Sequence, residues 1–153
     1  MCLLNPQKIE VTEPITCYKV VEVAHIPDGR VLVGSPIMRH IWIPGYEDHD
    51  TWHLDIHKTS PYSDLRELGA ESVLFGGAFH VCETFAGAKE FLEVMEKDRG
   101  TDCDNRHYAI GEFIIPTTSK YVYEGYHTYD NITTLGDSLA SEALIFVKLV
   151  EQT

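Results

Sequence analysis

The sequence has no long apolar run and few basic residues, and both absences exclude classes of protein. No stretch of the 153 residues approaches the roughly 20 apolar residues that a membrane helix needs. The opening MCLLNPQK lacks the basic flank and apolar segment of a signal peptide, so we expect a cytoplasmic protein, in the host cytoplasm if it is viral. Lysine and arginine number 12 against 24 aspartate and glutamate residues, a net charge of −12. Nucleic-acid phosphates are bound by basic side chains, so direct binding of nucleic acid is not expected.

Signatures of familiar catalytic sites are missing as well. The four cysteines form no CxxC or zinc-type pair, and Cys17 and Cys82 lie in apolar patterns where a free thiol packs as a small hydrophobe. The chain contains no GxSxG, Walker, kinase or zincin motif. It also has no internal repeat and no long linker, so we expect a single domain over 1–153 with an N-terminal arm at 1–14.

The clearest local signal is a helix from Thr84 to Lys97. Threonine is a residue type that caps helix N-termini. Behind it, apolar residues recur at the i, i+3, i+4, i+7 spacing of one helix face: Ala88, Phe91, Leu92 and Met95. Because this face is apolar, we expect it to cover a sheet.

Most other patterned segments predict strands. These segments are 15–24, 30–34, 73–82, 107–116, 119–125 and 141–150, with Pro27-Asp28-Gly29 as a turn between the first two. KIEVTE in the arm is a candidate edge strand, residues 38–63 are expected to be irregular, and 126–137 is expected to be a loop. The predicted fold is α+β: a curved, mostly antiparallel sheet of roughly six to eight strands with one main helix packed on one face.

Three groups of residues are candidates for a site. His80 in the strand GAFHVC is a candidate general base, with Cys82 or Glu124 as its catalytic partner. Aromatic side chains on one strand face and the loop after it are typical of a binding patch for a small molecule or protein. That patch comprises Tyr121, Tyr123, Tyr126, Tyr129 and Trp42.

A histidine run offers the third candidate, a metal site. His49, His53 and His57 are spaced by four, which on a helix would let neighbouring imidazoles share a divalent metal. The glutamate of HExxH is replaced by Asp50, and the segment also fits a solvated acidic loop. A divalent metal is the one cofactor that the sequence suggests.

Five segments together resemble a family of small phage and prophage proteins. They are CYKVV, LVGSPI followed by Trp42 and Gly45, GAFHVCETFAGAKEFL, IIPTTSKYVYEG and SEALIFVKLV. The shared pattern is a strand-borne Gly-Phe-His motif followed by a helix, from which this chain departs by inserting Ala78 before Phe79. The resemblance implies a fold and an origin in a mobile element, and it implies no particular activity.

These observations leave three functional hypotheses open. The first is a non-enzymatic binding protein that uses its Tyr/Trp surface to hold a small ligand or a host protein. The second is a small transferase or hydrolase centred on His80. The third is an acidic inhibitor that mimics nucleic acid and occupies the basic groove of another protein.

Overall fold

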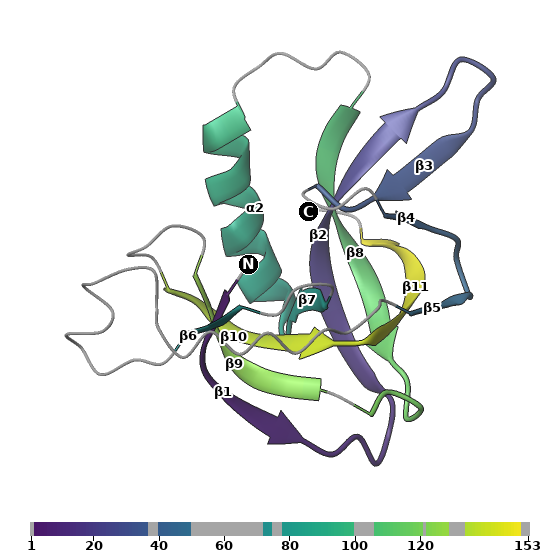
Figure 1. The fold of residues 1–153 in the computed structure, drawn as a ribbon. Helices are drawn as coiled ribbons and strands as arrows, with labels where there is room; N and C mark the ends of the chain where they lie inside the picture. Colours follow the sequence, from purple (N-terminus) through teal and green to yellow (C-terminus); the bar gives the residue numbers. More distant parts are fainter. Residues whose placement is uncertain are drawn as a thin grey trace.

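The described residues form one large sheet and one helix (Figure 1). The computed structural model describes residues 2–36, 40–49, 72–74, 78–99, 106–120, 122–128 and 134–150. The elements are β1 Cys2–Ile9, β2 Ile15–His25, β3 Val31–Gly34, β4 Ile41–Trp42, β5 Glu47–His49, β6 Ser72–Leu74, β7 Phe79–Cys82, α2 Phe85–Arg99, β8 Arg106–Ile115, β9 Val122–Thr128, β10 Thr134–Ser141 and β11 Ala143–Val150.

The sheet is open and strongly curved. Its strands are hydrogen-bonded in the order β5-β11-β8-β2-β7-β10-β9-β1-β6, with β3 attached to β2 and β4 to β3. Every pairing between described strands is antiparallel. The α+β class and the antiparallel sheet are therefore confirmed, whereas the eleven strands exceed the expected six to eight. In Figure 1 β2 and β8 run steeply while β1, β9 and β10 lie across them.

The main core fills the space between these two parts of the sheet. One part contributes Cys17, Val21, Phe113 and Phe146, and the other contributes Phe79, Val81, Val122 and Leu139. Alternation along each strand turns these residues to one face. Curvature thus lets a single sheet bury its own inner face without a second sheet.

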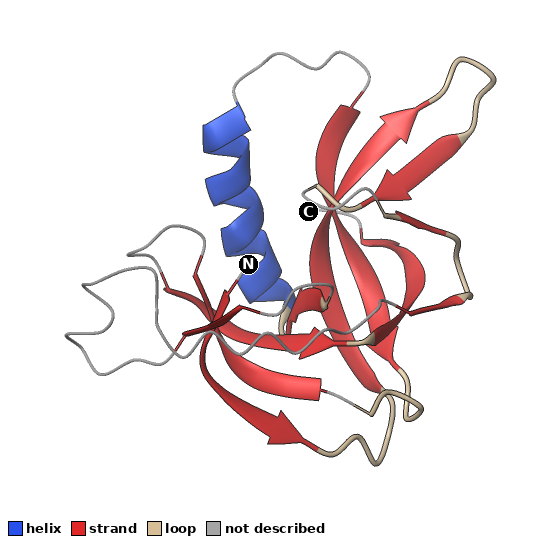
Figure 2. Ribbon diagram, in the orientation of Figure 1, coloured by secondary structure: helices blue, strands red, loops and turns tan. Residues whose placement is uncertain are grey.

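The helix covers part of the opposite face (Figure 2). Helix α2 starts after Thr84, whose Oγ1 accepts a hydrogen bond from the Gly87 amide at 3.0 Å. This confirms the predicted cap. The predicted apolar face is buried against Val20 of β2, Cys82 of β7 and Ile110 of β8. No helix in the described part of the chain is both long and apolar enough to cross a membrane.

The first hairpin also follows its sequence signals. Gly29 has a φ of +90°, which glycine adopts without the steric cost that a Cβ would bring. The Gly29 amide donates to the Ile26 carbonyl at 2.9 Å, and Arg30 bonds Asp28 across the turn. Strand β2 then pairs with β3 on one side and, over ten consecutive residue pairs, with β8 on the other.

The prediction of a loop at 126–137 was wrong for the part of that range that the structure describes, 126–128 and 134–137. Strand β9 continues to Thr128, and β10 begins at Thr134 and pairs with both β7 and β9. The segment TLGDSLAS lacks apolar alternation, because serines occupy buried positions in it. Ser141 is fully buried, and its hydroxyl lies 2.8 Å from that of Ser119 and donates to the Ala143 carbonyl. Ladder pairing on both sides outweighs the weak local preference.

Two further segments contain more β-strand residues than the sequence predicted. In the predicted arm, β1 pairs with β9 on one side and β6 on the other, with Pro6 at a register shift where its missing N–H is tolerated. The stretch 38–63, which we expected to be irregular, contributes β4 and β5 within its described residues.

Candidate functional site

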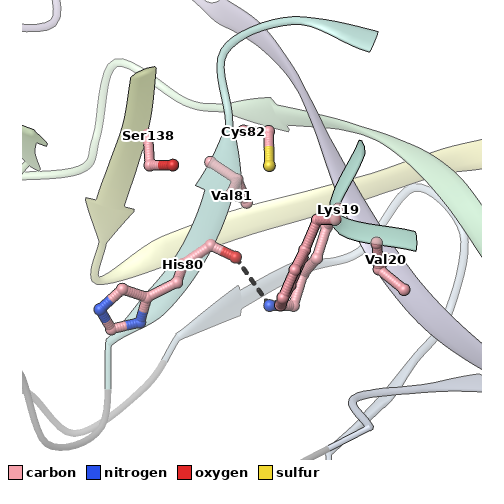
Figure 3. A pocket seen from close by; sticks show the side chains of 7 residues that line it. Lys19, Val20, His80, Val81, Cys82 and Ser138 are labelled. Atoms are coloured by element: carbon pink, nitrogen blue, oxygen red, sulfur yellow. Dashed lines mark hydrogen bonds between the residues drawn. The ribbon is translucent and has the colours of Figure 1, made fainter. Parts of the chain in front are cut away.

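A buried lysine lies where β2 and β7 part. The two strands are bridged at the single pair Tyr18–Cys82, and beyond it the Lys19 side chain enters the gap. Its Nζ donates to the His80 carbonyl at 2.7 Å, as Figure 3 shows, and Lys19 is only 6% exposed. Burial lowers the pKa of Lys19 from 10.5 to about 8. The ammonium therefore takes the place of the ladder hydrogen bonds that the splayed strands do not make.

The cavity beside Lys19 is too small for a substrate. It measures about 10 Å³, room for roughly one water molecule, and its lining includes His80, Cys82, Phe91 and Ser138. In Figure 3 the His80 ring points away from Cys82. His80 Nδ1 lies 3.1 Å from the Ala78 carbonyl, so this ring nitrogen contacts the main chain and not a catalytic partner.

The thiol of Cys82 is poorly suited to nucleophilic chemistry. Burial raises its pKa to about 11, against a smaller lowering from Lys19 and from the nearby Ser138 hydroxyl. At neutral pH the thiolate, which is the reactive form, is scarcely populated. His80 and Cys82 thus lie close in the fold without the geometry or ionisation of a catalytic pair, and Glu124 lies apart from them on β9.

A larger cavity opens on the sheet face that carries the main core, at the end where that core gives way to polar side chains. It measures about 180 Å³ and is lined by Gln7 of β1, Glu124, Gly125 and Tyr126 of β9, and Asp137 of β10. The register explains the grouping, because Gln7 lies opposite Glu124 and Asp137 lies opposite Tyr126. Glu124 and Tyr126, separated by two residues, therefore share one face.

Glu83 adds another carboxyl to this acidic surface. It follows β7, and its amide donates to the Asp137 carbonyl at 3.1 Å. Partial burial raises the pKa of Glu83 to about 7, helped by a hydrogen bond with the Glu124 side chain and by the negative charges of Glu124 and Asp137. Carboxylates this close favour retention of a proton between them.

Stability should therefore respond to pH near neutrality through Glu83. Because its folded pKa lies above the ordinary 4.5, the protonated form stabilises the fold, and this contribution is lost as the pH rises through about 7. In wild-type protein, we expect the free energy of unfolding to fall by roughly 1 kcal/mol at most between pH 4.5 and 7.5, since solvent screens the group. Glu83→Gln should lack this fall in the free energy of unfolding, which is measured by urea unfolding at a series of pH values. An unchanged profile in the variant would contradict the assignment.

The aromatic candidates separate in the structure. Trp42 is 3% exposed and packs in the main core against Phe79 and Phe113, so it does not line a surface. Tyr123 is partly buried against a small cluster of Leu3, Ala78 and Ala140. Tyr126 is 46% exposed and lines the acidic cavity, whereas Tyr121 and Tyr129 lie outside the described residues.

Of the three histidines predicted to hold a metal, the structure describes one. His49 is in β5, and its Nε2 lies 2.9 Å from Glu47 Oε1. His53 and His57 lie outside the described residues. Within the ranges that the structure describes, no three His, Cys, Asp or Glu side chains form a set that would hold a metal ion.

Sequence reasoning missed Lys19, Glu83 and Asp137. A lysine inside the strand ITCYKVV was a usable signal, because charged residues are rarely buried without a partner. Glu83 and Asp137 gave no comparable signal, since their proximity depends on the pairing of β10 with β7. That strand was expected to be largely loop.

The fold places the chain in the α+β class, among proteins built on a curved antiparallel sheet with one covering helix. Comparison with models of known families, with curated proteins and with solved structures finds no match.

Proposed function

We propose that the chain is a non-enzymatic binding protein, encoded by a phage or prophage, that holds a cationic group of a small ligand or host protein. The cavity at Glu124 and Tyr126 carries the proposal. It is about 180 Å³, below the roughly 300 Å³ at which drug-sized pockets begin, so it suits one ammonium or guanidinium group.

The lining determines the charge of the guest. Glu124 and Asp137 supply carboxylate oxygens, and Gln7 supplies an amide. Tyr126 offers an exposed ring beside them, and an aromatic face attracts a cation. The −12 net charge of the chain adds a long-range attraction for the same kind of partner.

The enzymatic alternative receives less support from the same residues. Lys19, His80 and Cys82 surround a space of about 10 Å³, and the raised pKa of Cys82 disfavours a thiolate. Binding of a cation at the acidic cavity requires neither a larger space beside Lys19 nor a thiolate at Cys82.

A matched pair of probes tests the proposal. Nuclear magnetic resonance titration with N-acetyl-lysinamide should shift amide signals in β9 and β10, and the uncharged N-acetyl-norleucinamide should not. Glu124→Gln should weaken the binding of the charged probe by roughly two- to fivefold, the value of one exposed carboxylate–cation pair. Glu93→Gln on the exposed face of α2 is the control for the same change of charge. Equal shifts from both probes, or equal weakening by both variants, would reject the proposal.

A further inference from the structure

Two histidines lie side by side at the end of the longest ladder in the sheet. His107 of β8 pairs with Val23 of β2, and His25 follows Val23 by two residues, so alternation places both imidazoles on one face. Their ring centroids are 5.2 Å apart, and the planes are inclined by 17°. The ten residue pairs of β2 and β8, which include Val23–His107, fix the two backbones relative to each other.

The spacing of the rings matches that of two imidazoles on one metal ion. A zinc–nitrogen bond is about 2.1 Å, and the ring centre lies roughly 1.1 Å beyond the nitrogen, so each centroid sits about 3.2 Å from the metal. At a tetrahedral angle, two such rings have centroids about 5.2 Å apart. His25 and His107 therefore need side-chain rotation at most, without movement of the strands.

The ring nitrogens are available for a ligand. Neither imidazole has a hydrogen-bond partner within the described part of the chain, and both residues are exposed. The two neighbouring arginines are neutralised by their own partners, since Arg106 lies 3.3 Å from Glu22 and Arg30 lies 2.6 Å from Asp28. A cation thus meets little repulsion at this end of the sheet.

We propose that His25 and His107 bind a divalent transition metal ion of the zinc, nickel and copper group. Imidazole nitrogen is a preferred ligand of these ions, whereas magnesium and calcium prefer oxygen. Water fills the remaining coordination positions. The site is separate from the acidic cavity, and it tethers the end of the β2–β3 hairpin to the start of β8.

Calorimetric titration of the full chain with zinc chloride tests the site. His107→Phe keeps a flat ring against His25 but removes the nitrogens, so it separates metal binding from ring stacking. We expect this variant, and likewise His25→Phe, to lose one equivalent of zinc or at least about tenfold in affinity. His49→Ala and His53→Ala should bind that equivalent as the wild type does.

A second readout uses the wild type alone, so it stands even if a variant folds poorly. Adding zinc should shift the imidazole ring-proton resonances of both His25 and His107 in parallel, saturating at the same metal concentration. If His107→Phe binds the same number of zinc equivalents as the wild type with unchanged affinity, the proposal is overturned. Loss of the same equivalent in His53→Ala, or a wild-type titration in which those two ring signals do not move, also overturns it.

Discussion

Replacing Phe113 with alanine should lower the free energy of unfolding by about 3–5 kcal/mol, a large share of the stability of a domain of this size. Phe113 is fully buried in the main core. Its ring meets Trp42 edge-on at 5.0 Å and lies 5.2 Å from Phe146. Truncation leaves a cavity between the two parts of the sheet, which the surrounding strands cannot close without breaking pairing.

Urea unfolding followed by circular dichroism measures the loss. Tyr46→Ala is the matched control, because it removes an aromatic ring that is 66% exposed and should change the free energy by less than about 0.5 kcal/mol. Gly111→Ala tests the same packing by adding an atom where Phe113→Ala removes a ring. The added Cβ would lie 2.6 Å from the Phe113 ring, so the ring or the strand would have to shift. A Phe113→Ala protein as stable as Tyr46→Ala would mean that the sheet does not close around this ring.

The parts of the fold that the sequence predicted are those with strong local signals. Helix α2 has a cap at Thr84 and an uninterrupted apolar face, and both lie within one short stretch of chain. The β2–β3 hairpin has Gly29 at a position that requires positive φ. In each case, the physical cause and its consequence are neighbours in sequence.

Strand β10 shows why the rest could not be predicted. Its buried positions include Ser138 and Ser141, and the Ser141 hydroxyl is satisfied by Ser119 and by the Ala143 carbonyl. Such partners are visible only once the chain has folded. A segment that reads as polar loop can therefore be an inner strand when its neighbours complete its hydrogen bonds.

Only some residues of the acidic cavity could be predicted from the sequence, for a related reason. Glu124 and Tyr126 were both candidates, under different hypotheses, but Tyr126 was expected in the loop after the strand, and β9 places the two on one strand face. Asp137 and Glu83 join them through the register of β10 with β9 and β7. Because register is a tertiary property here, the proposal of a cationic guest needed the structure.

Lys19→Met should change the sign of its effect on stability as the pH rises. Near pH 7 the wild type keeps a buried charge, and lowering the pKa from 10.5 to about 8 corresponds to about 3 kcal/mol of lost stability. Methionine removes that cost but leaves the His80 carbonyl without its Nζ donor, a loss of about 1–3 kcal/mol. The variant should therefore be more stable than wild type at pH 7, by up to about 2 kcal/mol.

The higher stability of Lys19→Met relative to wild type should disappear at alkaline pH. The unfolded lysine binds a proton up to pH 10.5, whereas the folded one releases it near pH 8, so wild-type stability gains from this group over that interval. By pH 10 we expect the difference between variant and wild type to have moved by about 2 kcal/mol in favour of wild type. The buried thiols oppose this gain, because their raised pKa values lower stability above pH 9 in both proteins. Burial is the largest cause of those raised values and is common to the two proteins, so the comparison removes most of the thiol contribution. Lys148→Met, at an exposed position of β11, should show no such movement in urea unfolding. A constant difference between Lys19→Met and wild type from pH 7 to 10 would mean that Lys19 is not buried as an ammonium between β2 and β7.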